Sequence, residues 1–403
     1  MSWKITGGQV LREGRIALGE ITLEDGLISN AATASRHFDA SALMVLPGIV
    51  DIHGDAHERA LQPRPNVDFP ASFAMADAAA QCLASGITTA YLGVTLSWEP
   101  GLRSLTAFVA TLEALRTPPL GPELRVHLRF EADNFAAEPA ALAAIAAGEV
   151  HLLGFNDHTP SIVKKLTNPK ELGKYAGRAG VSEAELVALA QRAYSRRAEV
   201  PAMRARMAAA ASAAGIPMLS HDDATLQDRG MFRGLGASIC EFPMAESVAA
   251  DARTAGEAVV MGAPNVVRGG SHLGWASAAP LAERGLVTVL ASDYHWPALL
   301  AAPFRMVTRG VLDLAASWAL VSTNPADALG LVDRGRIAPG LRADLALTTV
   351  DGRLMAVFVA GDLAWLAPDA AMRLRGGGTG LLDADVPQPR LQAASAGSPA
   401  HTS

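Results

Sequence analysis

The chain has 403 residues, of which half are hydrophobic and 18% are charged, so it can bury a large core and is not disordered as a whole. Its 34 Lys and Arg residues against 40 Asp and Glu residues give a net charge of −6, which disfavours nucleic acid or an anionic membrane as a partner. The N-terminus lacks a secretory leader pattern, and no uncharged apolar run reaches the roughly 18 residues of a membrane span, so we expect a cytoplasmic protein.

The two ends of the chain predict one small β domain. Residues 1–46 contain short strands separated by glycines, and a similar pattern returns in residues 334–373. We expect the two ends to combine in a β-sandwich. The final residues, 374–403, are poor in bulky apolar groups and are predicted to form a flexible tail.

Residues 47–333 alternate short apolar strand candidates with alanine-rich helical stretches, which is the pattern of βα units and a parallel sheet. The predicted strands are 44–53, 87–94, 124–131, 151–157, 216–221, 237–241, 258–262 and 287–293. Eight such strands suit a closed (β/α)8 TIM-type barrel, and an open doubly wound sheet is the alternative. Cys82 and Cys240 lie far apart in apolar segments, so we expect small core residues and no disulfide or thiolate metal site.

Polar residues follow five of these strands. They are His53 and Asp55, Glu131, Asp157 and His158, the run from His221 to Asp223, and Asp293. In a barrel the carboxyl ends of the strands share one mouth, so these side chains would converge there. His53 and Asp55 are two residues apart, which places both on one face of a strand.

Imidazoles mixed with carboxylates form a ligand set suited to Zn²⁺, Mn²⁺ or Fe²⁺, and the absence of thiolates disfavours a structural zinc site. Six candidate ligands, His53, Asp55, Glu131, His158, His221 and Asp293, are too many for one tetrahedral ion and suit two divalent ions that share a bridging carboxylate. Such pairs lower the pKa of a water, so the set predicts a hydrolase.

Each candidate also has an ordinary structural interpretation. A single histidine after a strand is more often a surface or core residue than a ligand. Asp222 and Asp223 fit the cap of the next helix. Glu131 fits an ion pair with Arg129 or Arg125 on a solvated face.

Basic residues follow the candidate ligands along the chain. They are Arg64 between two prolines, Lys164 and Lys165, Lys174 and Arg178, and Arg268 in a glycine-rich segment that runs to His272. Arginine contacts phosphate through two nitrogens at once, and glycine lets backbone N–H groups approach it. The pattern predicts a phosphorylated small-molecule substrate, with solvated surface charge as the alternative for each residue.

The segment LPGIVDIH over 46–53 and the segment 335–344 resemble the amidohydrolase superfamily, and the resemblance covers nearly the whole chain. Longer blocks resemble its diphosphatase group of phosphonate catabolism. These blocks are 53–58, 63–70, 156–160, 220–223, 260–272 and 291–294.

The resemblance implies a (β/α)8 barrel, a binuclear metal centre of Zn²⁺ or Mn²⁺, and hydrolysis of a ribose 1-methylphosphonate 5-triphosphate to the 5-phosphate and pyrophosphate. By the same resemblance one ion is held by His53, Asp55, Glu131 and Asp293, and the other by Glu131, His158 and His221. Glu131 is then the bridging ligand, and Asp293 also acts as the catalytic base. The residues that would bind the polyphosphate are Arg64, Lys164, Arg268 and His272.

The chain departs from the superfamily pattern at several positions. The first strand carries HxD in place of HxH, which favours a harder metal such as Mn²⁺. The ligand histidines follow the fourth and fifth predicted strands, where the superfamily uses the fifth and sixth. Trp275, His295 and Trp296 add bulk near the expected substrate mouth.

Two other functions stay open on the sequence alone. One keeps the barrel and its metals but cleaves a C–N bond, as a cyclic amidase or a deaminase does, because a fold and a metal centre do not fix the bond that is cleaved. The other is a binding protein that no longer turns over a substrate. Exposed apolar helices on such a barrel are compatible with a homo-oligomer.

Overall fold

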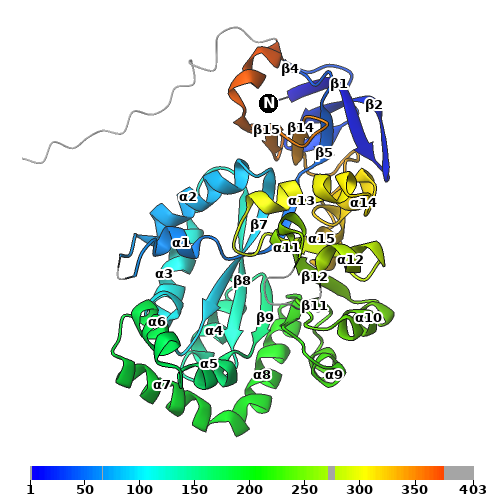
Figure 1. Ribbon diagram of the computed structural model, residues 1–403. Helices are drawn as coiled ribbons and strands as arrows, with labels where there is room; N and C mark the ends of the chain where they lie inside the picture. The colour runs from blue at the N-terminus through cyan, green and yellow to red at the C-terminus, as the bar shows by residue number, and fades with distance from the viewer. Residues whose placement is uncertain (1, 66, 271–276, 376–403) are drawn as a thin grey trace, which may run out of the picture.

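The protein is described by a computed structural model over residues 2–65, 67–270 and 277–375. Its strands form two sheets, one of eight parallel strands and one of nine strands in mixed directions. In Figure 1 the helices surround the eight-stranded sheet, and strands from both ends of the chain lie together beyond one end of it.

The eight-stranded sheet is a barrel whose strands follow one another in chain order. They are β6 (Ile49–Gly54), β7 (Ile87–Leu96), β8 (Glu123–Glu131), β9 (Leu152–Asn156), β10 (Met218–His221), β11 (Ile239–Glu241), β12 (Ala258–Gly262) and β13 (Val289–Ala291). The first and last strands meet at their carboxyl ends, where Asp293 N donates to His53 O and Asp55 N donates to Asp293 O, each at 2.9 Å. The predicted barrel is confirmed, and the open sheet is excluded.

The first predicted strand, 44–53, is wrong in one respect, because it is two strands. β5 (Met44–Pro47) belongs to the nine-stranded sheet, and β6 begins after Gly48. A Cβ atom on Gly48 would lie 2.4 Å from Thr88 Oγ1, so only glycine fits where the chain crosses from one sheet to the other.

Helices occupy the segments between the barrel strands and follow the last one, as the sequence predicts, and some of them, such as Ala71–Leu83 and Val200–Ala213, are rich in alanine. The helices are α1 (Glu58–Leu61), α2 (Ala71–Leu83), α3 (Leu105–Arg116), α4 (Glu138–Ala146), α5 (Thr159–Lys165), α6 (Pro169–Ala179), α7 (Glu183–Ser195), α8 (Val200–Ala213), α9 (Leu226–Gly234), α10 (Glu246–Thr254), α11 (Ala263–Arg268), α12 (Ala278–Glu283), α13 (Pro297–Thr308), α14 (Leu314–Ala319) and α15 (Thr323–Ala328). Short 3₁₀ turns cover Gly101–Arg103, Arg197–Glu199 and Pro368–Arg373. In the described part of the chain, no helix has the length and apolar character that a membrane crossing requires.

The nine-stranded sheet draws on both ends of the chain. Besides β5 its strands are β1 (Ser2–Arg12), β2 (Arg15–Glu24), β3 (Leu27–Ser29), β4 (Arg36–Asp39), β14 (Leu345–Thr348), β15 (Leu354–Val359), β16 (Asp362–Leu366) and β17 (Leu374–Arg375). Two strands separate β1 from β15, yet the rings of Trp3 and Phe358 lie 5.5 Å apart, and Phe38 of β4 lies 6.1 Å from Phe358. The sheet therefore folds over its own aromatic core, and the predicted small β-sandwich is confirmed.

Two smaller predictions concern the cysteines and the tail. Cys82 and Cys240 are both buried and free, as predicted. Of the predicted tail, Leu374 and Arg375 pair with β4, and residues 376–403 lie outside the described residues. The predicted domain boundaries, 1–46 with 334–373 and 47–333, stay a prediction.

Candidate metal centre

The carboxyl ends of β6 and β13 bring three of the predicted ligands together. His53 lies in β6, Asp55 follows it, and Asp293 follows β13. Ligand atoms of these residues lie within 4.8 Å of one another. The backbone bonds that join β6 to Asp293 fix this arrangement, and Asp293 takes a left-handed φ of 55°, which aspartate tolerates better than most residues.

A second group of ligand atoms forms after β9 and β10. His158 follows β9 and His221 ends β10, and together with Asp222 they place ligand atoms within 4.8 Å of one another. The histidines thus follow the fourth and fifth barrel strands, as counted in the sequence. The side chain of Thr225 caps α9 in a capping box with Asp228, so the interpretation of Asp222 and Asp223 as helix caps is wrong.

Glu241 connects the two groups, and the sequence analysis missed it. It is fully buried, and its two carboxylate oxygens lie 2.7 Å from the Nδ1 atoms of His53 and His221. A carboxylate only accepts hydrogen bonds, so both Nδ1 atoms carry a proton, and Nε2 is the atom of each ring that could ligate a metal. Burial alone would raise the pKa of Glu241, but His53 and His221 lower it well below its ordinary value.

Glu131 contacts the second group through His158. Its carboxylate accepts hydrogen bonds from the backbone N–H groups of His158 at 2.7 Å and Thr159 at 2.9 Å, and its other oxygen lies 3.0 Å from His158 Nδ1. Although burial opposes ionisation, these contacts lower the pKa of Glu131 to about 2, so the carboxylate is charged at neutral pH. Its role as a bridge between two ions stays a prediction.

Two further residues of β8 point into the same region. Arg129 lies between the two groups, with guanidinium nitrogens 3.2 Å from Asp55 Oδ2 and 3.4 Å from His221 Nε2. His127 is fully buried, its ring centroid lies 5.0 Å from that of His53, and neither ring nitrogen has a hydrogen-bond partner among the described residues. The interpretation that pairs Glu131 with Arg129 or Arg125 is wrong, because Arg129 pairs with Asp55 and Arg125 with Glu123.

These residues fit a divalent metal ion. His53 Nε2 is buried and lacks a hydrogen-bond partner in the described part of the chain, and the surrounding donors are imidazole nitrogens and carboxylate oxygens. Burial raises the pKa of Asp293 to about 6, with Asp55 adding to the effect. A carboxylate with a raised pKa is a stronger proton acceptor than an ordinary aspartate, and in its ionised form it can also ligate a cation.

The predicted phosphate-binding residues are spread over the rim of the barrel. Arg64, Lys164 and Arg268 are exposed, and Arg268 lies 3.5 Å from Tyr294 Oη. Arg64 lines a cavity of about 510 Å³, which is bordered by α1, α6 and the loop between α1 and α2. Lys164 does not line that cavity, and His272 lies outside the described residues.

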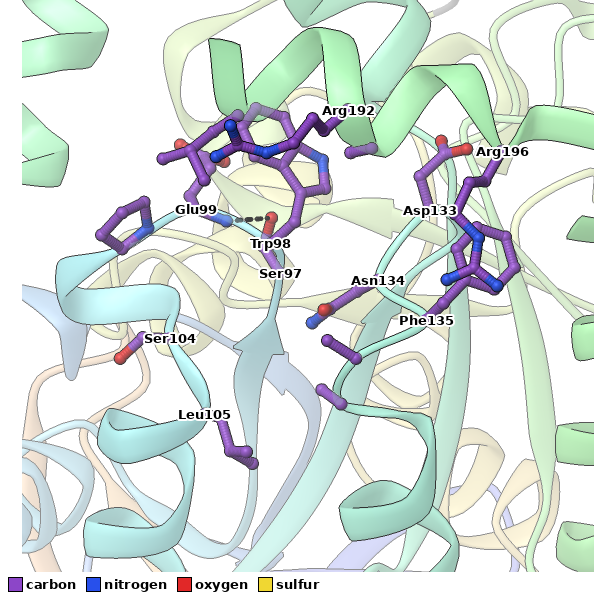
Figure 2. A pocket seen from close by; sticks show the side chains of 15 residues that line it. Ser97, Trp98, Glu99, Ser104, Leu105, Asp133, Asn134, Phe135, Arg192 and Arg196 are labelled. Carbon is purple, nitrogen blue, oxygen red and sulfur yellow. Dashed lines mark hydrogen bonds between the residues drawn. The ribbon is translucent and has the colours of Figure 1, made fainter. Parts of the chain in front are cut away.

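A second cavity, of about 380 Å³, opens beside the ends of β7 and β8 (Figure 2). Trp98 and Glu99 come from the segment after β7, Asn134 and Phe135 from the loop after β8, and Arg192 from α7. Its lining mixes aromatic rings, carboxylates and arginines, so it is less uniformly basic than the cavity around Arg64.

Comparisons with known proteins identify the relatives of the chain. No protein-family profile matches it. It is 34% identical, over 358 residues, to the α-D-ribose 1-methylphosphonate 5-triphosphate diphosphatase of Escherichia coli strain K12, a match that covers 85% of this chain and 94% of that protein.

Solved structures share the fold. A β-aspartyl dipeptidase from Fervidobacterium islandicum AW-1 has a TM-score of 0.61 at 13% identity, covering 91% of this chain and 98% of that one. An N-acetylglucosamine-6-phosphate deacetylase from Pasteurella multocida has a TM-score of 0.59 at 11% identity, covering 90% and 99%. A structure described as an amidohydrolase has a TM-score of 0.54 at 15% identity, covering 91% and 99%. The chain therefore belongs to the family of its Escherichia coli relative, which is a family of hydrolases, and it shares its fold with a structure described as an amidohydrolase.

Proposed function

We propose that this chain hydrolyses α-D-ribose 1-methylphosphonate 5-triphosphate to the 5-phosphate and pyrophosphate. The observation that carries the proposal is the meeting of His53, Asp55 and Asp293 with His158 and His221 at one end of the barrel. The name of the Escherichia coli relative supports the choice of substrate, since the match covers most of both chains.

Two divalent ions, Zn²⁺ or Mn²⁺ with Fe²⁺ as a further candidate, fit the two groups of donors. One would be held by His53, Asp55 and Asp293, and the other by His158 and His221, with the Glu131 carboxylate as the proposed bridge. When bound, such ions supply Lewis-acid polarisation of a phosphoryl oxygen and a water of lowered pKa.

The chain's own residues have distinct tasks in this proposal. Glu241 fixes the orientation and the tautomer of His53 and His221 through its hydrogen bonds to their Nδ1 atoms. Asp293 accepts the proton of the attacking water, because its raised pKa of about 6 makes it an adequate base close to neutral pH. The Arg129 guanidinium offsets negative charge at the centre, where it already contacts Asp55.

The exposed cations at the rim bind the triphosphate. Arg64 and Arg268 present guanidinium groups that contact phosphoryl oxygens through two nitrogens, and Lys164 adds a further positive charge. We also assign His272 to this task, on the resemblance alone. Negative charge that develops on the phosphoryl oxygens is stabilised most by donors already held in place.

The proposal is tested by initial rates on the triphosphate and on a panel of cyclic amides and amines, with protein loaded with Mn²⁺ or Zn²⁺. We expect pyrophosphate release, its loss in His221→Ala, and a raised KM in Arg64→Ala and Arg268→Ala. Hydrolysis of a neutral amide at a rate that neither arginine substitution changes would contradict the proposal and indicate C–N hydrolysis.

A further inference from the structure

The cavity of about 510 Å³ beside α6 gathers basic side chains that are far apart in the sequence. Its lining includes Arg59, Arg64, Lys174, Tyr175, Gly177 and Arg178. Arg59 belongs to α1, Arg64 to the loop that follows, and the others to α6. We propose that this cavity is the subsite for the pyrophosphoryl part of the substrate, the group that leaves when the triphosphate is cleaved.

The cavity adjoins the candidate metal centre. Glu58, which also lines the cavity, follows Asp55 by three residues, and Glu58 N donates to Asp55 O at 2.9 Å. Arg59 donates to the backbone oxygen of Tyr294 at 2.6 Å, and Tyr294 directly follows Asp293. These contacts join lining residues of the cavity to the segments that carry Asp55 and Asp293, and on this ground we assign the cavity to the phosphoryl groups beyond the bond that is cleaved.

The charges in the cavity are arranged for an anion. Its one lining carboxylate, Glu58, is neutralised by Arg103 at 3.0 Å. Arg59 is held by a neutral carbonyl oxygen and keeps its full charge. The Arg64 side chain has no hydrogen-bond or ion-pair partner among the described residues, and the ion-pair partner found for Lys174 is Glu171 at 4.0 Å. Three cationic groups thus remain weakly compensated around one space.

Arg178 is held in place before any ligand arrives. Its guanidinium pairs with the buried carboxylate of Glu99 and lies 4.7 Å from the centre of the Tyr175 ring. An immobilised arginine loses little conformational entropy on binding a phosphate. Glu99 also lines the neighbouring cavity of Figure 2, so this ion pair forms part of the wall between the two.

The shape of α6 leaves room for phosphoryl oxygens. Gly177 lies one turn from Gly173 on the same side of the helix, and both line the cavity. A Cβ atom on Gly177 would meet no protein atom within 4 Å. The cavity of Figure 2 is the weaker candidate for a condensed phosphate, because its lining has as many carboxylates, Glu99 and Asp133, as arginines, whereas one carboxylate and four cationic side chains line the cavity beside α6.

The choice of a pyrophosphoryl ligand rests on the proposed diphosphatase activity, but the subsite is tested without turnover. The probe is labelled inorganic pyrophosphate in equilibrium dialysis against the full-length, metal-loaded protein, repeated after chelator treatment. We expect Arg64→Ala and Lys174→Ala each to weaken binding about tenfold, with or without metal, because each removes a charge-assisted contact.

Lys170→Ala is the matched control, since Lys170 is an exposed lysine of the same helix that does not line the cavity. It should bind pyrophosphate as the wild type does. Equal losses in Lys170→Ala and Lys174→Ala, or no loss in Arg64→Ala and Lys174→Ala, would overturn the subsite.

The two proposals fail in different ways. If the wild type releases no pyrophosphate from the triphosphate but binds pyrophosphate in a manner that depends on Lys174, the activity is wrong and the subsite stands. If the wild type releases pyrophosphate from the triphosphate, but Arg64→Ala and Lys174→Ala bind inorganic pyrophosphate as tightly as the wild type, the subsite is wrong and the activity stands.

Discussion

Replacing Glu241 by Gln should lower the affinity for metal, and this loss should exceed what any decrease in the stability of the fold would cause. Glu241 accepts hydrogen bonds from the Nδ1 atoms of His53 and His221, each at 2.7 Å. A glutamine has one acceptor oxygen, so only one imidazole keeps its bond and the other faces an N–H donor. That imidazole either loses the bond or moves its proton to Nε2, and protonated Nε2 cannot ligate a metal.

The lost bond is one between an imidazole and a charged carboxylate, which contributes roughly 1.5–3 kcal/mol. If it is lost from the metal-binding form, metal affinity falls about 10- to 150-fold. The assay is metal content per chain by mass spectrometry after dialysis against graded chelator, with thermal unfolding of the same samples.

Glu257→Gln is the control, because Glu257 is also a buried carboxylate, ion-paired with Arg229 and Arg233, but precedes β12 at the opposite end of the barrel. It should lower the unfolding temperature and leave the metal content unchanged. Equal metal retention by Glu241→Gln and the wild type would refute the reasoning.

Three further predictions follow from the site and the core. Asp293→Asn should lower kcat about 10²- to 10⁴-fold, because it removes the proposed base, and a kcat within a factor of two of the wild type would exclude that role. In metal-free protein the raised pKa of Asp293, about 6 against 3.8 unfolded, means that the folded state holds more protons between these values. The contribution of Asp293 to stability should therefore fall as pH rises from about 4 to 6, and Asp293→Asn should lack this contribution, so the difference in unfolding free energy between the two proteins should change over this range; parallel plots of stability against pH for the two proteins would contradict this. Phe358→Ala should cost about 3–5 kcal/mol in denaturant unfolding, because Phe358 lies at ring contact with Trp3 and Phe38, yet it should leave the metal content intact; metal loss would link this core to the centre.

The barrel could be predicted because its strands carry a strong local signal. Strands such as β7 are buried along their whole length, so apolar residues predominate in them and charged residues are absent from β7. A polar residue after such a run marks the mouth, and this rule found His53, Asp55, His221 and Asp293. The exchange of sheets at Gly48 was missed, because β5 and β6 are both apolar and a single glycine separates them.

The residues of the metal centre that were not predicted could have been recognised from their positions in the strands. Glu241 is the last residue of the sixth barrel strand, so the strand-end rule already applied to it. His127 and Arg129 alternate with apolar residues in β8 and share a face with Glu131. Alternate residues of a strand lie on the same face, so this spacing predicts that all three side chains point to the same side of the sheet.

The grouping of the basic residues could not be predicted. The sequence predicts that Arg64, Lys164, Arg268 and His272 act together. The structure places Arg64 in one cavity with Lys174 and Arg178, and Lys164 does not line that cavity. Charges that are distant in the chain share a cavity only through the packing of loops and helices, and no local pattern reports that packing.

The most direct test of the proposed activity is phosphorus NMR of the reaction of the metal-loaded protein with α-D-ribose 1-methylphosphonate 5-triphosphate. The account predicts that pyrophosphate and the 5-phosphate appear in equal amounts with the phosphonate signal retained, and that both products form at least about a hundredfold more slowly with Asp293→Asn. Orthophosphate as the first product, or no phosphorus product from a protein shown to hold two metal ions per chain, would contradict it.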